Sequence, residues 1–185
     1  MMAANTSDTM DPMLSQLLAA IQSIRPNLDF KTRVLLEAML LMEGPLGSAE
    51  VVSRDLGLRN RFELSRLLQR EGVPSLHRLS AWVLLLSWVQ RAERDGTSLC
   101  HLAVQSHRHP SACYRLVKEI TGLRWAQVRG RGSEWVSGQL MEAFHEARTE
   151  LRRRADRSRS RLGSVPKMIR WKSRWPWRHQ TNETR

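Results

Sequence analysis

Two stretches of the sequence resemble each other and start 49 positions apart, at Leu64 and at Cys113. In each, an Arg is followed by two aliphatic residues and then by charged residues, and a Gly that can end a helix closes the stretch. Each stretch also follows a short apolar segment and a polar turn. The repeat therefore predicts a helix, a turn and a second helix that occur twice, with cationic side chains on one face. Such an arrangement is typical of a protein that contacts DNA at two places.

The spacing of apolar residues along the chain predicts helices and no strands. Gly57, Gly72 and Gly122 supply left-handed helix ends, and Gly130 with Gly132 predicts a flexible joint. The fold class that we expect is all-α, with two helix-turn-helix subdomains joined by a long linker helix in a homeodomain-like arrangement. The expected helices cover residues 13–24, 31–42, 48–56, 60–71, 75–94, 98–105, 110–121 and 133–154, with one further turn at 125–128.

Charge is distributed unevenly along the chain. Residues 148–185 hold 13 Lys or Arg against 3 Asp or Glu, whereas the remaining residues hold 17 against 15. A strongly basic segment favours polyanions, which are nucleic acids or anionic membrane surfaces. We expect four parts: a polar N-terminal end with a short helix (1–30), a double helix-turn-helix domain (31–129), an additional amphipathic helix (130–155) and a basic disordered tail (156–185).

Other features exclude several classes of protein. The longest apolar run, from Ala81 to Val89, is interrupted by Ser87 and is about half of the ~20 residues that cross a bilayer. The first residues are acidic and polar and do not form a signal peptide, and the two Cys make no disulfide framework. We expect a cytoplasmic protein with reduced thiols, and a nucleoid-associated one because the repeat indicates DNA contact. No nucleophile elbow, phosphate loop or paired-carboxylate arrangement is present in the sequence, so we expect neither an enzyme nor a cofactor.

One group of residues, between Cys100 and Cys113, has the composition of a metal site. His101, His107 and His109 lie between the two thiols. Their spacing fits no standard zinc pattern, and Cys113 belongs to an inward-facing apolar stripe. Core thiols and turn histidines are the simpler interpretation, so we expect no metal ligand.

The second helix of each repeat has one apolar side and one polar side. Arg on the polar side of such a helix can donate two hydrogen bonds to guanine in the major groove, and Ser or Gln can bond to base edges. Lys and Arg near the helix ends are suited to phosphate, which sets the register of a protein on DNA. The predicted DNA-binding residues are Arg61, Ser65, Arg66 and Gln69 in the first repeat and Ser111, Tyr114, Arg115 and Lys118 in the second.

The expected linker helix 75–94 spans about 30 Å at about 1.5 Å per residue. Successive major-groove segments on one face of a duplex lie about 34 Å apart. A rigid linker of this length is compatible with two recognition helices in adjacent turns of the duplex. It is equally compatible with an ordinary packing helix.

Residues 31–129 resemble the double helix-turn-helix DNA-binding domain of the AraC/XylS family of bacterial transcription regulators. The stretch from Gly57 to Pro74 is similar to the family's first recognition helix, because the turn Gly, the central Leu-Ser-Arg and the closing Gly fall at the family's intervals. The stretch from Pro110 to Lys118, with Thr121 and Gly122 behind it, is similar to the second. The resemblance implies a sequence-specific transcription factor whose base-facing residues are Arg61, Ser65 and Arg66 in the first unit and Ser111, Tyr114 and Arg115 in the second.

The second unit departs from the family pattern at three positions. Ser106 stands where the family's turn has Gly, and His107 replaces the usual aromatic residue after it. Leu102 occupies a position where a small residue lets the two helices approach, although Ala103 follows directly. Ser106 at positive φ costs about 1 kcal/mol relative to Gly. We therefore expect the second unit to be tilted or to bind phosphate without reading bases. The family's usual sensor domain is not expected, because too few residues precede the matched part.

Together these features predict a sequence-specific DNA-binding transcription factor that inserts two recognition helices into adjacent major-groove segments. Double-stranded DNA is the expected partner, and RNA polymerase and a second copy of the chain are further candidates. Segment 13–24 is either a dimer-forming helix or a cap on the core. The alternative function is a degenerate helix-turn-helix module that binds other proteins, or a non-specific nucleic-acid binder without promoter specificity.

The basic tail contains a segment, 167–178, in which cations alternate with three Trp. Three interpretations of this segment stay open: phosphate contact with aromatic stacking, adsorption to an anionic membrane face, and a solvated end. Nucleic acid is favoured over membrane because the repeat already points there.

Overall fold

The computed structural model describes residues 12–163 of the 185-residue chain. These residues form eight helices and no strand, so the predicted all-α class is confirmed. The helices are α1 (Pro12–Ile24), α2 (Phe30–Leu41), α3 (Ala49–Asp55), α4 (Arg61–Arg70), α5 (Leu76–Asp95), α6 (Leu99–Gln105), α7 (Pro110–Thr121) and α8 (Trp125–Gly163).

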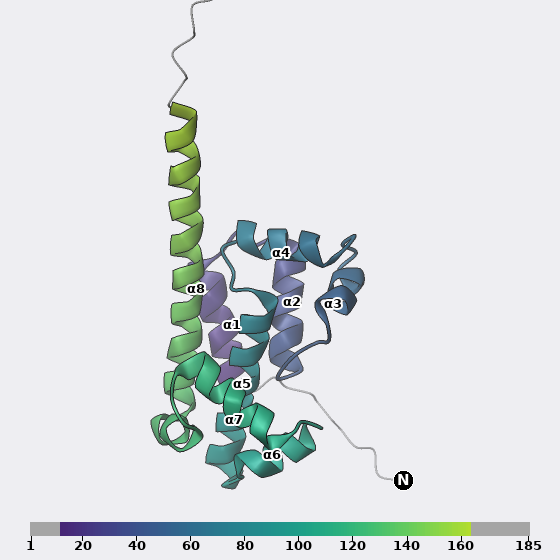
Figure 1. The fold of residues 1–185 in the computed structure, drawn as a ribbon, viewed down its shortest axis with the longest axis vertical. Helices are drawn as coiled ribbons and strands as arrows, with labels where there is room; N and C mark the ends of the chain where they lie inside the picture. The colour runs from purple at the N-terminus through teal and green to yellow at the C-terminus, as the bar shows by residue number, and fades with distance from the viewer. Residues whose placement is uncertain (1–11, 164–185) are drawn as a thin grey trace, which may run out of the picture.

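Helix α5 is the centre of the fold. Every one of its residues from Ala81 to Val89 is buried. The α3–α4 pair lies toward the beginning of α5, the α6–α7 pair lies toward its end, and α8 runs along it (Figure 1). A helix that is covered on all sides needs apolar residues all round, which explains the long apolar run in the sequence. No helix within residues 12–163 is both long and apolar enough to cross a membrane.

One hydrophobic core joins α5 to α1, α2 and α8. Trp88 of α5, Ile21 of α1, Leu36 of α2 and Phe144 of α8 are almost completely buried and belong to the same cluster. Leu17 is buried beside Ile21, so the apolar side of α1 packs onto the body. Of the two interpretations of segment 13–24, this burial favours the cap on the core.

Side-chain caps explain where the helices begin. Asp29, Ser48, Asn60, Ser75 and Ser98 each accept a hydrogen bond from a backbone N–H in the first turn of the helix that follows. Such a cap satisfies a donor that has no partner within the helix, and it contributes about 1 kcal/mol. Residues of this kind can be recognised in the sequence. The observed starts of α1 to α7 consequently differ from the predicted ones by no more than one residue.

Helix α8 contains the break that the sequence predicts. The joint expected at Gly130 and Gly132 lies at Gly132, whose φ of 83° and ψ of 173° are not helical, so α8 consists of two helical segments that meet there. Directly after the break, the Glu93 carboxylate of α5 accepts the N–H of Ser133 at 2.8 Å. Glycine is required at position 132 because residues with a Cβ rarely adopt φ 83° with ψ 173°; an added Cβ would also lie 2.7 Å from the same carboxylate oxygen, which the Glu93 side chain would have to move away.

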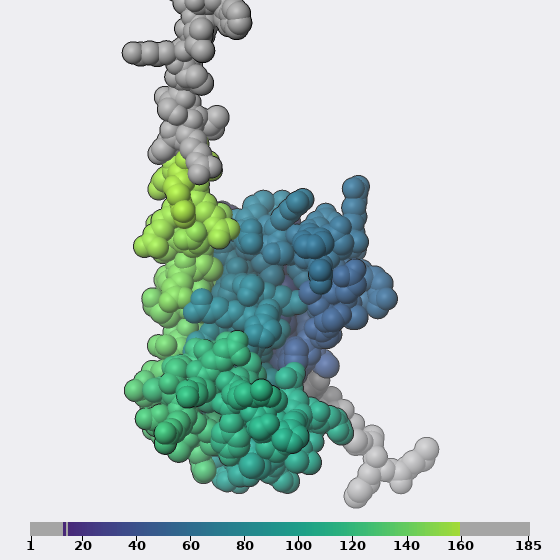
Figure 2. All heavy atoms as spheres, viewed as in Figure 1, coloured from purple at the N-terminus to yellow at the C-terminus, as the bar shows by residue number. Residues whose placement is uncertain are grey.

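The C-terminal end of α8 differs from the prediction. The helix continues to Gly163, so the predicted disorder is wrong for residues 156–163, whereas residues 164–185 of the expected tail lie outside the described residues. Arg154 and Arg157 bind the Glu150 carboxylate, at 2.9 and 3.1 Å, from one and two turns further along. These ion pairs and the good helix propensity of Arg extend the helix beyond the end of its apolar face. Figure 2 shows α8, as far as it is drawn in colour, at the edge of the body.

Candidate nucleic-acid interface

The exposed side of α4 carries the four residues predicted for the first repeat. Leu64, Leu67 and Leu68 are buried beneath the helix. The helix starts at Asn60, whose side-chain oxygen accepts the N–H groups of Phe62 and Glu63, both at 3.0 Å. All four predicted residues, Arg61, Ser65, Arg66 and Gln69, are exposed.

The structure divides these four residues into two environments. Arg61, Ser65 and Gln69, which are four residues apart along one stripe, line a groove of about 560 Å³ between α4, the start of α5 and α8. Arg66 is exposed outside this groove and has no ion-pair partner within residues 12–163. Phe62, which the sequence reasoning missed, is 61% exposed on α4. Its signal was a large apolar residue at an outward position of the helix.

The opposite wall of the groove comes from α8, and its carboxylates are paired. Arg78 of α5 contacts Glu146 at 2.7 Å, and Arg154 contacts Glu150 at 2.9 Å. The hydrogen bond from Arg154 holds the pKa of the Glu150 carboxyl below its ordinary value of 4.5. The two α8 carboxylates that line the groove are therefore each neutralised by at least one Arg, which limits their repulsion of an approaching anion.

The exposed side of α7 carries the four residues predicted for the second repeat, and Cys113 and Val117 are buried beneath it. Two of the four make local contacts. Ser111 Oγ lies 2.7 Å from Nδ1 of His109, which caps the helix, and the Tyr114 hydroxyl lies 3.7 Å from Cys100 Sγ. The contact with Cys100 raises the pKa of Tyr114 above its ordinary value of 10.0. The two remaining residues, Arg115 and Lys118, have no ion-pair partner within the described residues.

The turn between α3 and α4 and the turn between α6 and α7 have the same hydrogen bonds. The N–H of Leu58 donates to the carbonyl of Ser53, and the N–H of Arg108 donates to the carbonyl of Ala103, both at 2.8 Å. The residue before each donor has a left-handed backbone, with φ 63° at Gly57 and φ 52° at His107. The left-handed residue itself also donates: the N–H of Gly57 bonds to the carbonyl of Arg54, and the N–H of His107 bonds to the carbonyl of Val104. These two hydrogen bonds at each helix end form a Schellman motif.

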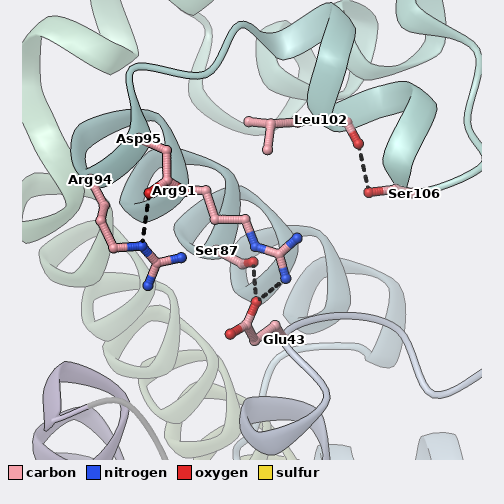
Figure 3. Close-up of polar contacts among 7 residues, drawn as sticks. All are labelled: Glu43, Ser87, Arg91, Arg94, Asp95, Leu102 and Ser106. Carbon is pink, nitrogen blue, oxygen red and sulfur yellow. Dashed lines mark hydrogen bonds and ion pairs between the residues drawn. The ribbon is translucent and has the colours of Figure 1, made fainter.

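This geometry corrects the predicted register of the second turn. Ser106 has φ −85°, so the expected positive φ at Ser106 is wrong, and His107 takes the left-handed position instead. The Ser106 hydroxyl donates to the carbonyl of Leu102 at 2.8 Å (Figure 3). The small residue of the α6–α7 pair is Ala103 and not Leu102, because Ala103 accepts the bond that Ser53 accepts in the first turn. Position 106 was predicted to be left-handed because the second turn was given the length of the first. The left-handed residue lies three positions before the cap in the first turn (Gly57 and Asn60) but only two positions before it in the second (His107 and His109).

The Cys and His residues near the second turn have separate local roles. Cys113 is buried, and burial raises the pKa of its thiol, whereas Cys100 is exposed beside Tyr114. His101 contacts Gln105 at 2.9 Å, and His109 caps α7. Within residues 12–163, no group of three or more His, Cys, Asp or Glu is placed to hold a metal ion.

A polar joint connects the end of α2 to α5. Glu43 accepts hydrogen bonds from Ser87 at 2.8 Å and from Arg91 at 2.6 Å (Figure 3). Burial acts to raise the pKa of the Glu43 carboxyl, but the hydrogen bonds from Arg91 and Ser87 and the nearby positive charges outweigh it. The pKa therefore lies below its ordinary value of 4.5. Glu43 also has a left-handed backbone, with φ 52°, and nothing in its residue type indicated this position.

No protein-family model, no curated protein and no solved structure matches this chain. The resemblance to the AraC/XylS family therefore stays a prediction from the sequence motifs.

Proposed function

We propose that the chain is a sequence-specific DNA-binding transcription factor whose helices α4 and α7 enter adjacent major-groove segments of one duplex. The observation that carries this proposal is the repeated helix pair: α3–α4 and α6–α7 each join two helices through a short turn, and in each pair the second helix exposes an Arg without an ion-pair partner among the described residues. The hydrogen bonds of the two turns also occur at the ends of α2 and α4, so they are ordinary helix-end bonds. A helix in this position can enter the major groove, where such an Arg reaches base edges.

Helix α5 supports the proposed spacing of the two pairs. It contains 20 residues and has one pair near each end (Figure 1). At about 1.5 Å per residue its length is about 30 Å, which is close to the ~34 Å between major-groove segments on one face of a duplex.

The proposed roles of the residues on α4 follow from their surroundings. Arg66 donates two hydrogen bonds to guanine, because its guanidinium is exposed and has no other ion-pair partner within residues 12–163. Ser65 and Gln69 bond to base edges or phosphates on the groove side of the helix. The guanidinium of Arg61 lies over the Phe62 ring, 5.1 Å from its centroid, so this pair offers a cation and an apolar surface for a thymine methyl group.

The second pair is proposed to contribute more to affinity than to base selection. Ser111 and Tyr114 already bond to neighbouring side chains, which leaves Arg115 and Lys118 as the accessible donors. Lys on a recognition helix binds phosphate as a point charge, which orients the protein without reading sequence.

Selection of binding sites from a random duplex library, followed by fluorescence anisotropy at two salt concentrations, tests the proposal. The expected result is a shared motif in the selected duplexes and a loss of preference for it in Arg66→Ala. Arg33→Ala is the matched control, since Arg33 is an exposed Arg of α2 outside both second helices. Equal losses for selected and random DNA in Arg66→Ala would make Arg66 a phosphate contact and remove it from base reading.

The groove between α4 and α8 favours the alternative, a module that binds another protein through the same surface. Leu64, Leu68, Leu76 and Leu151 line this groove together with the polar residues of α4. Apolar clefts of this size between helices are common binding sites. The same selection experiment separates the two functions, because the alternative predicts either no duplex binding or salt-sensitive binding without a shared motif.

A further inference from the structure

Helix α8 has two parts with opposite surroundings. Val136, Leu140 and Phe144 of its first part are buried in the core against α5. From residue 152 to residue 159, every residue is exposed, and among them only Arg154 lines the groove beside α4. We call residues 152–159 the basic arm. Most helical stability in proteins comes from the packing of an apolar face, and the basic arm has none.

The basic arm has more Arg side chains than there are carboxylates to pair with them. Its eight residues include five Arg and one acidic residue, Asp156. Glu150, just before the arm, binds Arg154 and Arg157. The remaining three, Arg152, Arg153 and Arg159, have no ion-pair partner within residues 12–163. A rod with several unneutralised guanidinium groups is suited to a polyanion, which removes their mutual repulsion.

The root of the arm is fixed against the end of α4. Gly72, which follows α4, lies against the backbone of α8, and a Cβ at Gly72 would be 3.3 Å from the Cα of Arg148. Arg25 of the α1–α2 connection donates to the carbonyl of Glu71 beside it. From this anchor α8 continues past α4 (Figure 1). The arm therefore begins beside the C-terminal end of α4 and extends beyond it.

We propose that the basic arm binds the phosphate backbone that borders the major-groove segment entered by α4. This inference rests on the proposed DNA-binding function and adds a site that neither second helix contains. The major groove is about 12 Å wide, so a phosphate backbone runs along each side of an inserted helix. Arg152, Arg153 and Arg159 contact phosphates of the backbone on the α8 side, while Arg154 and Arg157, held by Glu150, stabilise the helix.

The composition of the arm decides between a duplex and a membrane as the polyanion. Helices that lie on membranes combine cations with large apolar residues that enter the lipid. Residues 152–159 contain no apolar residue larger than Ala155. Regularly placed Arg without an apolar side is the composition of a phosphate-binding helix.

The experiment uses the full chain and the triple variant Arg152→Gln, Arg153→Gln and Arg159→Gln. Gln keeps the helix propensity and removes the charge, and the replaced side chains are exposed, so we expect the fold to be retained. The matched control removes three exposed Arg from other parts of the surface: Arg33→Gln, Arg124→Gln and Arg129→Gln. Affinity for a selected duplex is measured between about 50 and 200 mM salt.

We expect the triple variant to select the same motif as the wild type but to bind it with weaker salt dependence. Three lost phosphate contacts lower the logarithmic salt slope by about 2.7, so that over a fourfold rise in salt the wild type loses about 40-fold more affinity than the variant does. Ethylation interference should disappear from the backbone on one side of the α4 half-site only. An equal change of slope in the control triple variant, or an unchanged slope in the arm variant, overturns the inference.

Failure of the arm and failure of the proposed function give different results. If the wild type selects a motif and the arm variant keeps its salt slope, the arm inference fails and the function stands. If the wild type selects no motif but the arm variant loses slope on random duplex, the arm stands and sequence reading fails. Binding to phosphatidylserine vesicles that exceeds duplex binding and disappears in the arm variant would overturn DNA as the arm's partner.

Discussion

The α3–α4 and α6–α7 pairs reach the same turn with different residues. Gly57 and His107 both take the left-handed position, and Asn60 and His109 both cap the helix that follows. A left-handed backbone costs Gly nothing in steric strain, whereas it costs another L-residue about 1–2 kcal/mol. The hydrogen bonds of the turn, and not its glycine, are therefore the shared feature, and the second pair is the more strained copy.

The two pairs also differ in what lies beneath the second helix. Leu64 and Leu68 of α4 occupy the register of Cys113 and Val117 of α7, and all four are buried. The second pair thus buries smaller side chains at equivalent positions. Because its turn is strained and its inner side chains are smaller, we expect it to be the less stable of the two, with α4 as the better fixed helix.

Truncation of the buried side chains beneath α4 and α7 should give the largest change in the free energy of unfolding. Leu68→Ala should lower the free energy of unfolding by about 2–5 kcal/mol, because it leaves a cavity beneath α4. Val117→Ala, in the same register of α7, removes two carbons and should cost about 1.5 kcal/mol at about 0.8 kcal/mol for each. Urea unfolding followed by circular dichroism measures both, and an equal or larger loss in Val117→Ala would contradict the ranking of the two pairs.

Removing the exposed Arg of each second helix should separate their roles on DNA. Arg66→Ala should weaken binding to a selected duplex by about 1–3 kcal/mol and relax preference at one base pair. Arg115→Ala should weaken binding by less than about 1 kcal/mol, to the same extent on all sequences. Anisotropy titrations with the selected duplex and with single-base variants measure these losses. A base preference that changes with Arg115 and not with Arg66 would reverse the assignment.

Substitution of the left-handed residue should destabilise the protein in the first turn and stabilise it in the second. Gly57→Ala should destabilise the protein by about 1–2 kcal/mol through the left-handed backbone alone, since an added Cβ meets only Lys31 Nζ at 3.9 Å. His107→Gly should stabilise it by about 0.5–1 kcal/mol, because relief of strain exceeds the extra freedom of Gly in the unfolded chain. Thermal unfolding of both variants tests this, and destabilisation by His107→Gly would show that the imidazole contributes more than its backbone costs.

The smallest effect concerns Glu43, which joins α2 to the helix that leads into the second pair. Because the pKa of Glu43 is lower in the folded protein, its carboxylate contributes stability above its ordinary pKa of 4.5. That contribution is lost as the pH falls through the folded pKa. Glu43→Gln should therefore lose less stability than the wild type between about pH 6 and pH 3. Urea unfolding at both pH values measures the difference, and identical losses in the two proteins would remove Glu43 from the acid response.

The candidate surface was predictable as two separate helix faces. The period of 3.6 residues assigned Arg61, Ser65, Arg66 and Gln69 to the exposed side of α4, and all are exposed. The sequence did not predict that Glu146 and Glu150 line a groove with three of them. These residues lie about 80 positions further along the chain, and no local pattern encodes a contact over such a separation.

The bounds of α1 to α7 and their inward faces were determined by the sequence alone, because caps, glycines and apolar periods act between residues a few positions apart. The packing of α8 against α5 and α4, the left-handed backbones of His107 and Glu43, and the projection of the basic arm were decided only by the tertiary structure. Each depends on how surfaces from distant parts of the chain fit together. The packing of these surfaces determines which exposed Arg side chains line the groove and which remain accessible to a binding partner.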